Sequence, residues 1–402
     1  MLPFSSRIKP ANQLFSTLYG SNPDTIARAP GRAEIIGNHT DYNSGYALSA
    51  AITQSTFVLA KKRSDKIVRV YSIGYSQKPS SFSLDTLEKG EHGHWLNYVK
   101  GVLAQLMKRG TLMEVDLLID SDVPSSGGVS SSAALELSIT TAVAALYHIS
   151  IEGVEKAFMC QKAENGPYIG IPCGFLDQAS SGLTQKDHVL FLDFKQKGSL
   201  PVSQIKQIPI DLSTSHLSFV VVVDKKVKRN LGTSGYPARR AKCEQSIPII
   251  SSIIGHPISS LRDISIETFK HCRKQLGKED NVMRKRVEHI VYENQRVLDA
   301  VKALQDRDIK RFGALLTESG KSALELYELD EQTPELTTLV TKGRRLDGVV
   351  GMRNMGGGFT AVALALVENA KMDSFKKQLS KLYNGNLEFL SFEPGNGAEL
   401  LR

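Results

Sequence analysis

Strand-like and helix-like segments mix in both halves of this chain, and a polar stretch at residues 195–209 separates the halves. Alternation and β-branched content predict the strands, while Ala- and Leu-rich or amphipathic spacing predicts the helices. The predicted strands are residues 67–71, 114–119, 187–194 and 217–223, and the predicted helices are residues 132–146 and 285–304. We therefore expect an α+β fold in two domains, residues 1–200 and 201–402.

The composition limits the class of protein and of ligand. The 50 Lys and Arg against 42 Asp and Glu give a net charge of +8 over 402 residues, which fits an anionic small ligand as well as nucleic acid. Four cysteines without a Cys-x-x-Cys pair indicate a reducing compartment rather than a disulfide scaffold. The N-terminal residues lack the apolar core of a signal peptide, and the apolar runs are too short to span a bilayer. We therefore expect a cytoplasmic protein without a membrane partner.

The first segment that carries chemistry is residues 28–51, where a strand-like approach ends in a dense polar run at residues 38–43. Such a run offers hydrogen-bond donors and acceptors at short range, which suits a hydroxyl-rich ligand such as a sugar. Arg32 lies just before it, as a fixed cation for a phosphate. By composition alone, a polar surface loop with turn glycines explains the segment as well.

The second segment, residues 123–138, joins a Gly- and Ser-rich loop to the start of a helix. Gly127 and Gly128 allow the backbone to curl, so that its N–H groups and the positive end of the helix dipole form an anion site. A serine here suits Mg²⁺ beside a nucleotide. The Gly-Lys-Ser/Thr of a Walker loop is absent, and an ordinary turn with a serine N-cap is the alternative interpretation.

A third glycine-bearing segment, residues 351–366, places Gly356, Gly357 and Gly358 before an apolar run. The glycines permit close approach of the backbone to a ligand. A hairpin turn explains them equally well, so this segment by itself is a weak signal.

Together and in order, these segments resemble the kinases named for galactokinase, homoserine, mevalonate and phosphomevalonate kinases (the GHMP kinases). The first segment is similar to the opening motif of the galactokinase branch. The matching stretches are residues 30–43 (PGRAEIIGNHTDYN), 95–101 (WLNYVKG), 128–133 (GVSSSA), 163–165 (AEN), 172–178 (PCGFLDQ), 236–240 (YPARR) and 356–359 (GGGF).

The resemblance implies a fold and a reaction. It implies two lobes, an N-terminal one with a ribosomal-protein-like α/β fold and a C-terminal ferredoxin-like one, with the active site in the cleft between them. The implied reaction moves the γ-phosphoryl group of Mg-ATP to the anomeric hydroxyl of galactose. Asp177 matches the catalytic carboxylate that accepts the proton of the sugar O1 or orients it, and Arg32 matches the cation beside the transferring group.

The resemblance also assigns ligand contacts. Ser132 and Glu164 match the Mg²⁺ ligands. Trp95 matches a residue near the adenine, although a core aromatic explains it nearly as well. The implied sugar contacts are Asn38, His39, Thr40, Asp41, Gly174 and Tyr236. The implied ATP contacts are Ser126, Gly127, Gly128, Val129, Ser130, Ser131, Ser132 and Trp95.

Two departures from the family pattern bear on the sugar. Asn38 stands where most galactokinases have a Glu that contacts the 6-hydroxyl, and Ala33-Glu34 replaces the usual apolar-Asn pair. Asparagine can still donate and accept a hydrogen bond, so we expect galactose as the substrate. The missing negative charge at position 38 makes galacturonate the runner-up.

Two other function classes are less favoured. A non-catalytic sugar sensor of this family would lack part of the Ser-Ser-Ala loop, which is present here at residues 131–133. The basic clusters at residues 225–229 and 342–345 lack interleaved aromatic residues, which argues against nucleic-acid binding. We expect a monomer whose partners are a small sugar and ATP.

Overall fold

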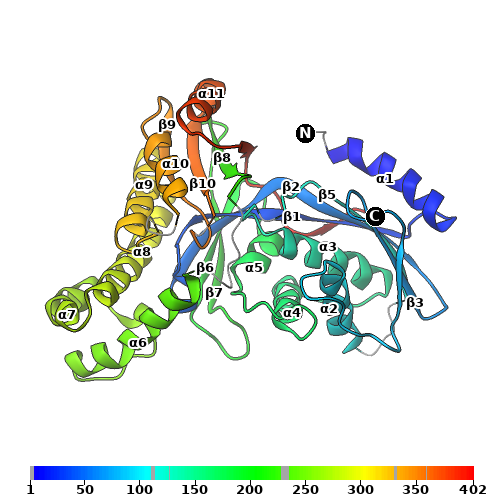
Figure 1. The fold of residues 1–402 in the computed structure, drawn as a ribbon, viewed down its shortest axis with the longest axis horizontal. Coiled ribbons are helices and arrows are strands. Elements are labelled where there is room, and N and C mark those ends of the chain that lie inside the picture. The colour runs from blue at the N-terminus through cyan, green and yellow to red at the C-terminus, as the bar shows by residue number, and fades with distance from the viewer. Residues whose placement is uncertain (1–3, 110–113, 126, 228–234, 330–332, 359) are drawn as a thin grey trace.

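The computed structural model describes residues 4–109, 114–125, 127–227, 235–329, 333–358 and 360–402. Within these ranges the strands form one eight-stranded sheet and one four-stranded sheet, and helices cover both (Figure 1).

The larger sheet is built mainly from the first half of the chain. Its main path has the order β12-β1-β2-β5-β3-β4, with β6 pairing to β2 and β7 to β6. All pairs are antiparallel except β3 with β5. The strands are β1 Thr25–Ile36, β2 Tyr46–Lys62, β3 Ile67–Ser72, β4 Ser80–Ser83, β5 Val115–Ser121, β6 His188–Asp193, β7 Gln204–Pro209 and β12 Glu399–Leu400.

Successive side chains of β2 point to opposite faces of the sheet, and both faces are apolar. Phe57 and Leu59 pack with Phe15 of the N-terminal helix α1 on one face. Val58 and Ala60 join the cluster that includes residues of α2 and α3 on the other face. Figure 1 shows α1 on one side of the sheet and α2 to α5 on the other. The helices are α1 Phe4–Tyr19, α2 Leu96–Met107, α3 Ser131–Leu146, α4 Gly153–Asn165 and α5 Leu176–Leu183.

The smaller sheet lies in the second half of the chain and has the order β11-β8-β10-β9. If the four strands are numbered by their order in the chain, they lie side by side in the sheet in the order 4-1-3-2. Helices separate the first strand from the second and the third from the fourth along the chain. Its strands are β8 Leu217–Asp224, β9 Val349–Asn354, β10 Val362–Glu368 and β11 Leu387–Phe392. Its helices are α6 Tyr236–Ile254, α7 Ile266–Glu279, α8 Asn281–Gln305, α9 Ile309–Glu325, α10 Pro334–Gly343 and α11 Met372–Leu382.

The predicted elements appear as β3, β5, β6, β8, α3 and α8, with ends shifted by at most a few residues. The polar stretch at residues 195–209 differs from expectation, because it contains β7, an edge strand paired with β6. Near the C-terminus, β12 returns to pair with β1. The larger sheet therefore takes strands from both sides of residue 200, and the division at that residue stays a prediction.

Two further expectations concern the cysteines and the membrane. Cys160, Cys173, Cys243 and Cys272 are all free thiols. Among the residues described, no helix combines the length and the apolar character that crossing a bilayer requires.

Candidate active site

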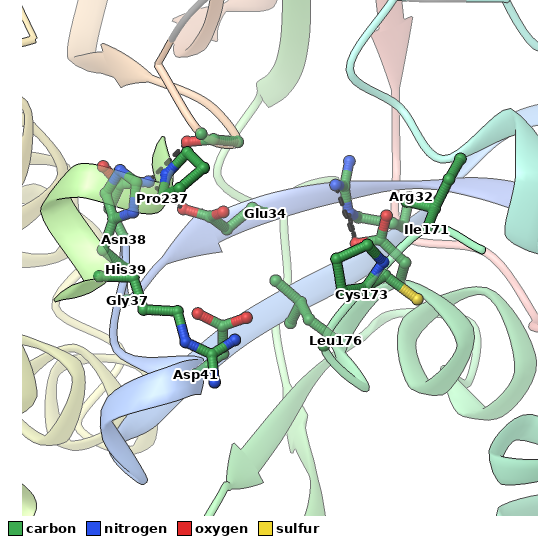
Figure 2. A pocket seen from close by; sticks show the side chains of 16 residues that line it. Arg32, Glu34, Gly37, Asn38, His39, Asp41, Ile171, Cys173, Leu176 and Pro237 are labelled. Carbon is green, nitrogen blue, oxygen red and sulfur yellow. Dashed lines mark hydrogen bonds and ion pairs between the residues drawn. The ribbon is translucent and has the colours of Figure 1, made fainter. Parts of the chain in front are cut away.

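A cavity of about 300 Å³ lies between the two halves of the chain. Its walls come from β1 and the loop after it, the loop before α5 with the first turn of that helix, the start of α6, and the loop between β9 and β10 (Figure 2). Segments far apart in the sequence therefore meet around one space of small-ligand size.

Arg32 on β1 connects this cavity to the Gly/Ser loop. Its Nε and Nη2 lie 3.0 and 2.9 Å from Asp177 Oδ1, and its Nη1 donates to the carbonyl of Gly128 at 2.5 Å. The backbone N–H of Arg32 donates to the carbonyl of Val129 at 2.9 Å. A Cβ on Gly31 would lie 2.6 Å from that same carbonyl, so the close approach of strand and loop requires glycine there. The buried guanidinium of Arg32 thus links Asp177 to the Gly/Ser loop.

The Gly/Ser loop has the backbone shape expected of an anion cradle. Gly128 and Ser130 have φ of 64° and 58°, so the chain turns sharply just before α3 begins at Ser131. The Ser130 hydroxyl is buried and has no hydrogen-bond partner among the described residues. A buried hydroxyl without a partner is costly in the protein alone, and a bound oxyanion would satisfy it.

Buried carboxylates lie behind the loop, on α3 and α4. Glu164 Oε2 accepts a hydrogen bond from Gln178 Nε2 at 2.6 Å and one from Cys173 Sγ at 3.4 Å. Burial, and to a lesser extent the charge of Asp177, raise the pKa of Glu164 to about 6. A hydrogen bond from the hydroxyl of Ser132 lowers this pKa and offsets part of the rise. Burial raises the pKa of Glu136 well above its usual range.

The polar run after β1 forms the opposite wall of the cavity. Asn38, His39 and Asp41 line the cavity, and His39 has a φ of 63°. Asp41 Oδ2 would lie 2.6 Å from a Cβ on Gly174, so any larger residue at position 174 would displace the Asp41 carboxylate. The Thr40 hydroxyl instead donates to the carbonyls of Gly37 and Tyr46 at 2.7 and 2.5 Å, at the two ends of its own loop.

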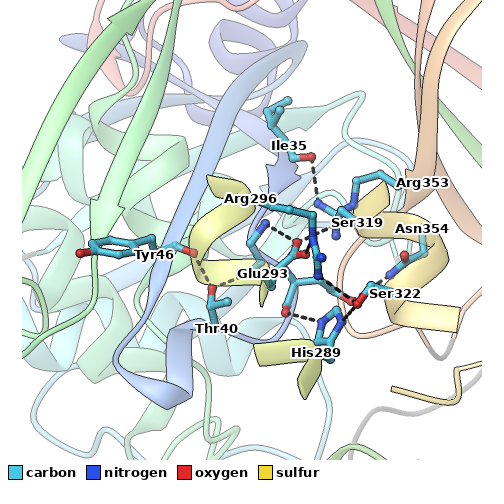
Figure 3. Close-up of polar contacts among 12 residues, drawn as sticks. Ile35, Thr40, Tyr46, His289, Glu293, Arg296, Ser319, Ser322, Arg353 and Asn354 are labelled. Carbon is cyan, nitrogen blue, oxygen red and sulfur yellow. Dashed lines mark hydrogen bonds and ion pairs between the residues drawn. The ribbon is translucent and has the colours of Figure 1, made fainter. Parts of the chain in front are cut away.

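Residues of helix α8 hydrogen-bond to the backbone of this loop (Figure 3). Glu293 Oε1 accepts hydrogen bonds from the backbone N–H groups of Gly37 and Asn38 at 3.0 and 3.2 Å. Its Oε2 accepts from Arg296 Nε at 2.7 Å. Burial by itself raises the pKa of Glu293, but the charge of Arg296, the further charges around it and the hydrogen bond from Ser319 together outweigh burial and hold that pKa well below its usual range. Burial lowers the pKa of His289 to about 4, and this neutral ring contacts the carbonyl of Asn38 at 3.1 Å.

The structure places six of the sequence-predicted site residues around the cavity, and Arg32 connects them to the Gly/Ser loop, whose described residues are outside the cavity lining. Those that line the cavity are Arg32, Asn38, His39, Asp41, Gly174 and Asp177. Trp95 packs instead beside the apolar cluster that includes residues of α2 and α3. Ser126 and the side chain of Tyr236 lie outside the described part of the structure, while Pro237 next to Tyr236 lines the cavity.

Several cavity residues were not among the predicted contacts. They are Glu34, Gly37, Ile171, Pro172, Cys173, Leu176, Pro237, Arg240, Gly356 and Gly357. The glycine triplet could have indicated Gly356 and Gly357, and the YPARR stretch could have indicated Arg240. The departure from the family pattern at position 34 could have indicated Glu34.

Comparison with known proteins bears directly on this site. The galactokinase galactose-binding signature matches residues 13–62, and the GHMP kinase N-terminal domain matches residues 97–185. Galactokinase of Chloroflexus aggregans is 37% identical over 362 residues, which cover 90% of this chain and 88% of that protein. The chain belongs to the galactokinase family. Galactokinase of a Roseiflexus species is 35% identical over 92% of this chain and 90% of its own.

Solved structures confirm the expected fold. Lactococcus lactis galactokinase, crystallised with galactose, superimposes with a TM-score of 0.88 at 32% identity, covering 98% of this chain and 99% of that one. A mevalonate kinase superimposes with a TM-score of 0.64 at 16% identity, over 92% of this chain and 99% of its own, which shows the fold alone. The predicted α+β GHMP kinase fold is therefore confirmed for this galactokinase relative.

Proposed function

We propose that this protein is a galactokinase, which transfers the γ-phosphoryl group of ATP to the anomeric O1 of D-galactose. The observation that carries the proposal is the buried guanidinium of Arg32, which bonds Asp177 on one side and the carbonyl of Gly128 on the other. A sugar in the cavity would present its hydroxyl at Asp177, and a triphosphate on the Gly/Ser loop would end beside Arg32. In-line phosphoryl transfer requires that juxtaposition.

The roles follow from position and charge. Asp177 accepts the proton from O1 or fixes that hydroxyl in line with the phosphorus atom. Arg32 stabilises the negative charge that spreads over the transferring group. Across the cavity, Asn38, His39, Asp41 and Gly174 bind the sugar, and Thr40 shapes their loop. Tyr236 remains a proposed sugar contact at the start of α6.

The Gly/Ser loop fits ATP with Mg²⁺. The hydroxyl of Ser130, which no described residue partners, and the curled backbone at Gly128 suit phosphate oxygens. Ser132 and Glu164 hydrogen-bond to each other and supply two oxygen donors of the kind that Mg²⁺ prefers, so we assign them as its ligands. When bound, Mg²⁺ neutralises charge on the β- and γ-phosphate oxygens. The remaining proposed nucleotide contacts are Ser126, Gly127, Val129, Ser131 and Trp95.

A substrate panel tests the function. With ATP and Mg²⁺, we expect ADP release to be fastest with galactose among galactose, galacturonate, N-acetylgalactosamine, glucose and arabinose. Binding of sugar and ATP without ADP release would identify a sensor instead. A preference for galacturonate that Asn38→Glu abolishes would support the runner-up substrate. A cytoplasmic, monomeric protein stays a prediction.

The pH dependence of sugar binding tests Asp41. Burial raises the pKa of this carboxyl to about 6, and the charges of Glu34 and Asp177 add to the effect. The carboxylate that accepts sugar hydroxyls is therefore lost as the pH falls through about 6, and KM for galactose should rise by up to about tenfold per pH unit below it. KM measured from pH 5 to 8 checks this. Asp41→Asn should bind weakly with a flatter profile, and a constant wild-type KM down to pH 5 would remove Asp41 from sugar binding.

A further inference from the structure

Glu34 is a buried carboxylate in the cavity wall and is not one of the predicted sugar contacts. It lies two residues after Arg32 on β1, so both side chains leave the same face of the strand. Only 4% of Glu34 is exposed, yet it lines the cavity. Figure 2 shows its carboxylate between Asn38 and Arg32.

Asn38, the expected sugar contact beside it, has little hydrogen-bonding capacity left. Its Nδ2 donates to Glu34 Oε1 at 3.1 Å and to the carbonyl of Gly356 at 2.7 Å. Its Oδ1 accepts from Asn354 Nδ2 at 3.0 Å. Because an amide has only two N–H groups, both donors of Asn38 are committed to the protein.

The two oxygens of Glu34 differ in their surroundings. Oε1 accepts from Asn38 and also from Arg353 Nη2 at 3.0 Å. Arg353 is fully buried and lies outside the cavity lining, so it anchors the carboxylate from behind. No described residue donates a hydrogen bond to Oε2. A ligand hydroxyl would satisfy that oxygen once water leaves the cavity.

We propose that Glu34 is a specificity-determining residue, whose Oε2 accepts a hydrogen bond from a sugar hydroxyl remote from O1. This inference rests on the proposed sugar-kinase function. In the galactokinase family pattern, the amide stands at position 34 and the carboxylate at position 38, so this chain exchanges the two and keeps the pair. The negative charge therefore stays at this end of the cavity, where it disfavours a sugar carboxylate such as that of galacturonate.

Glu34→Gln tests the proposal directly. Glutamine keeps an acceptor for Asn38 and Arg353 but replaces Oε2 with an NH₂ donor. We expect kcat/KM for galactose to fall by about 10- to 100-fold, the usual loss for a hydrogen bond to a charged group. The 3-, 4- and 6-deoxy forms of galactose serve as probes. For the form that lacks the contacted hydroxyl, variant and wild type should differ by less than about twofold.

A uniform loss over galactose and all three deoxy sugars would reduce Glu34 to a structural role and overturn the proposal. An unchanged kcat/KM for galactose would overturn it equally. Wild-type enzyme without ADP release on galactose would instead refute the proposed function. Thermal unfolding shows whether each variant is folded.

The reciprocal exchange provides a second test if Glu34→Gln fails to fold. Asn38→Glu places two carboxylates in contact, and Glu34→Asn leaves none, so we expect each single variant to lose at least about tenfold in kcat/KM. The double variant Glu34→Asn/Asn38→Glu restores one carboxylate and one amide. It should recover at least about tenfold over the weaker single variant. Additive losses in the double variant would contradict the exchange.

Discussion

Asp177→Asn lowers kcat for galactose by about 10²- to 10⁴-fold and changes the dissociation constant of the sugar by less than about threefold. Asparagine has the size of aspartate and still offers an oxygen to Arg32, which donates to Asp177 Oδ1 at 3.0 Å. It cannot take the proton of O1, however. The loss should therefore fall on the chemical step and leave ground-state binding nearly intact.

Turnover by coupled ADP release and sugar binding by calorimetry separate the two effects. Asp120→Asn is a matched control, because Asp120 Oδ2 accepts from Arg7 Nε at the same 3.0 Å but lies outside the cavity lining. The control should keep kcat within about twofold. Equal turnover of Asp177→Asn and wild type would remove Asp177 from the mechanism. A large loss of sugar binding with unchanged kcat would make it a binding residue only.

The segments that line the cavity, more than the individual residues, were predictable because they are short, dense motifs. Residues 30–43 and 172–178 each supply several cavity residues, so local pattern was sufficient there. Glu34 was not predictable from local pattern, because an acidic residue within a strand indicates a surface position unless its neighbours are known. Its partner Arg353 lies 319 residues further along the chain, and only the fold brings them together.

The secondary structure shows a parallel limit. Helix α8 was predictable because its buried residues recur at helical spacing. Strand β7 was not, because it is an edge strand whose residues, except Ile208, are exposed or only partly buried. Its sequence therefore carries little hydrophobic alternation and resembles a linker. Pairing with β6, rather than the composition of β7, makes it a strand.

Glu293→Ala should lower the free energy of unfolding by about 3–5 kcal/mol, the largest stability effect that we expect from a single side chain here. The change removes the partner of Arg296 and leaves the N–H groups of Gly37 and Asn38 without their acceptor. Glu293 is fully buried, so water cannot replace the lost hydrogen bonds without opening the contact between α8 and the loop after β1, called here the sugar loop (residues 37–45). KM for galactose should rise in parallel, because that loop carries Asn38, His39 and Asp41.

Urea denaturation and steady-state kinetics on the same variants check both parts. Glu288→Ala on the same helix is the control, since Glu288 pairs with Arg284 and with the more exposed Arg273, and we expect a loss below about 1 kcal/mol. Glu293→Gln should fall between the two, because it keeps one acceptor for the loop but faces Arg296 with a donor. If Glu293→Ala destabilises the protein while KM stays unchanged, α8 supports the fold without positioning the sugar loop. If neither quantity changes, His289 and the loop's own hydrogen bonds suffice to hold it.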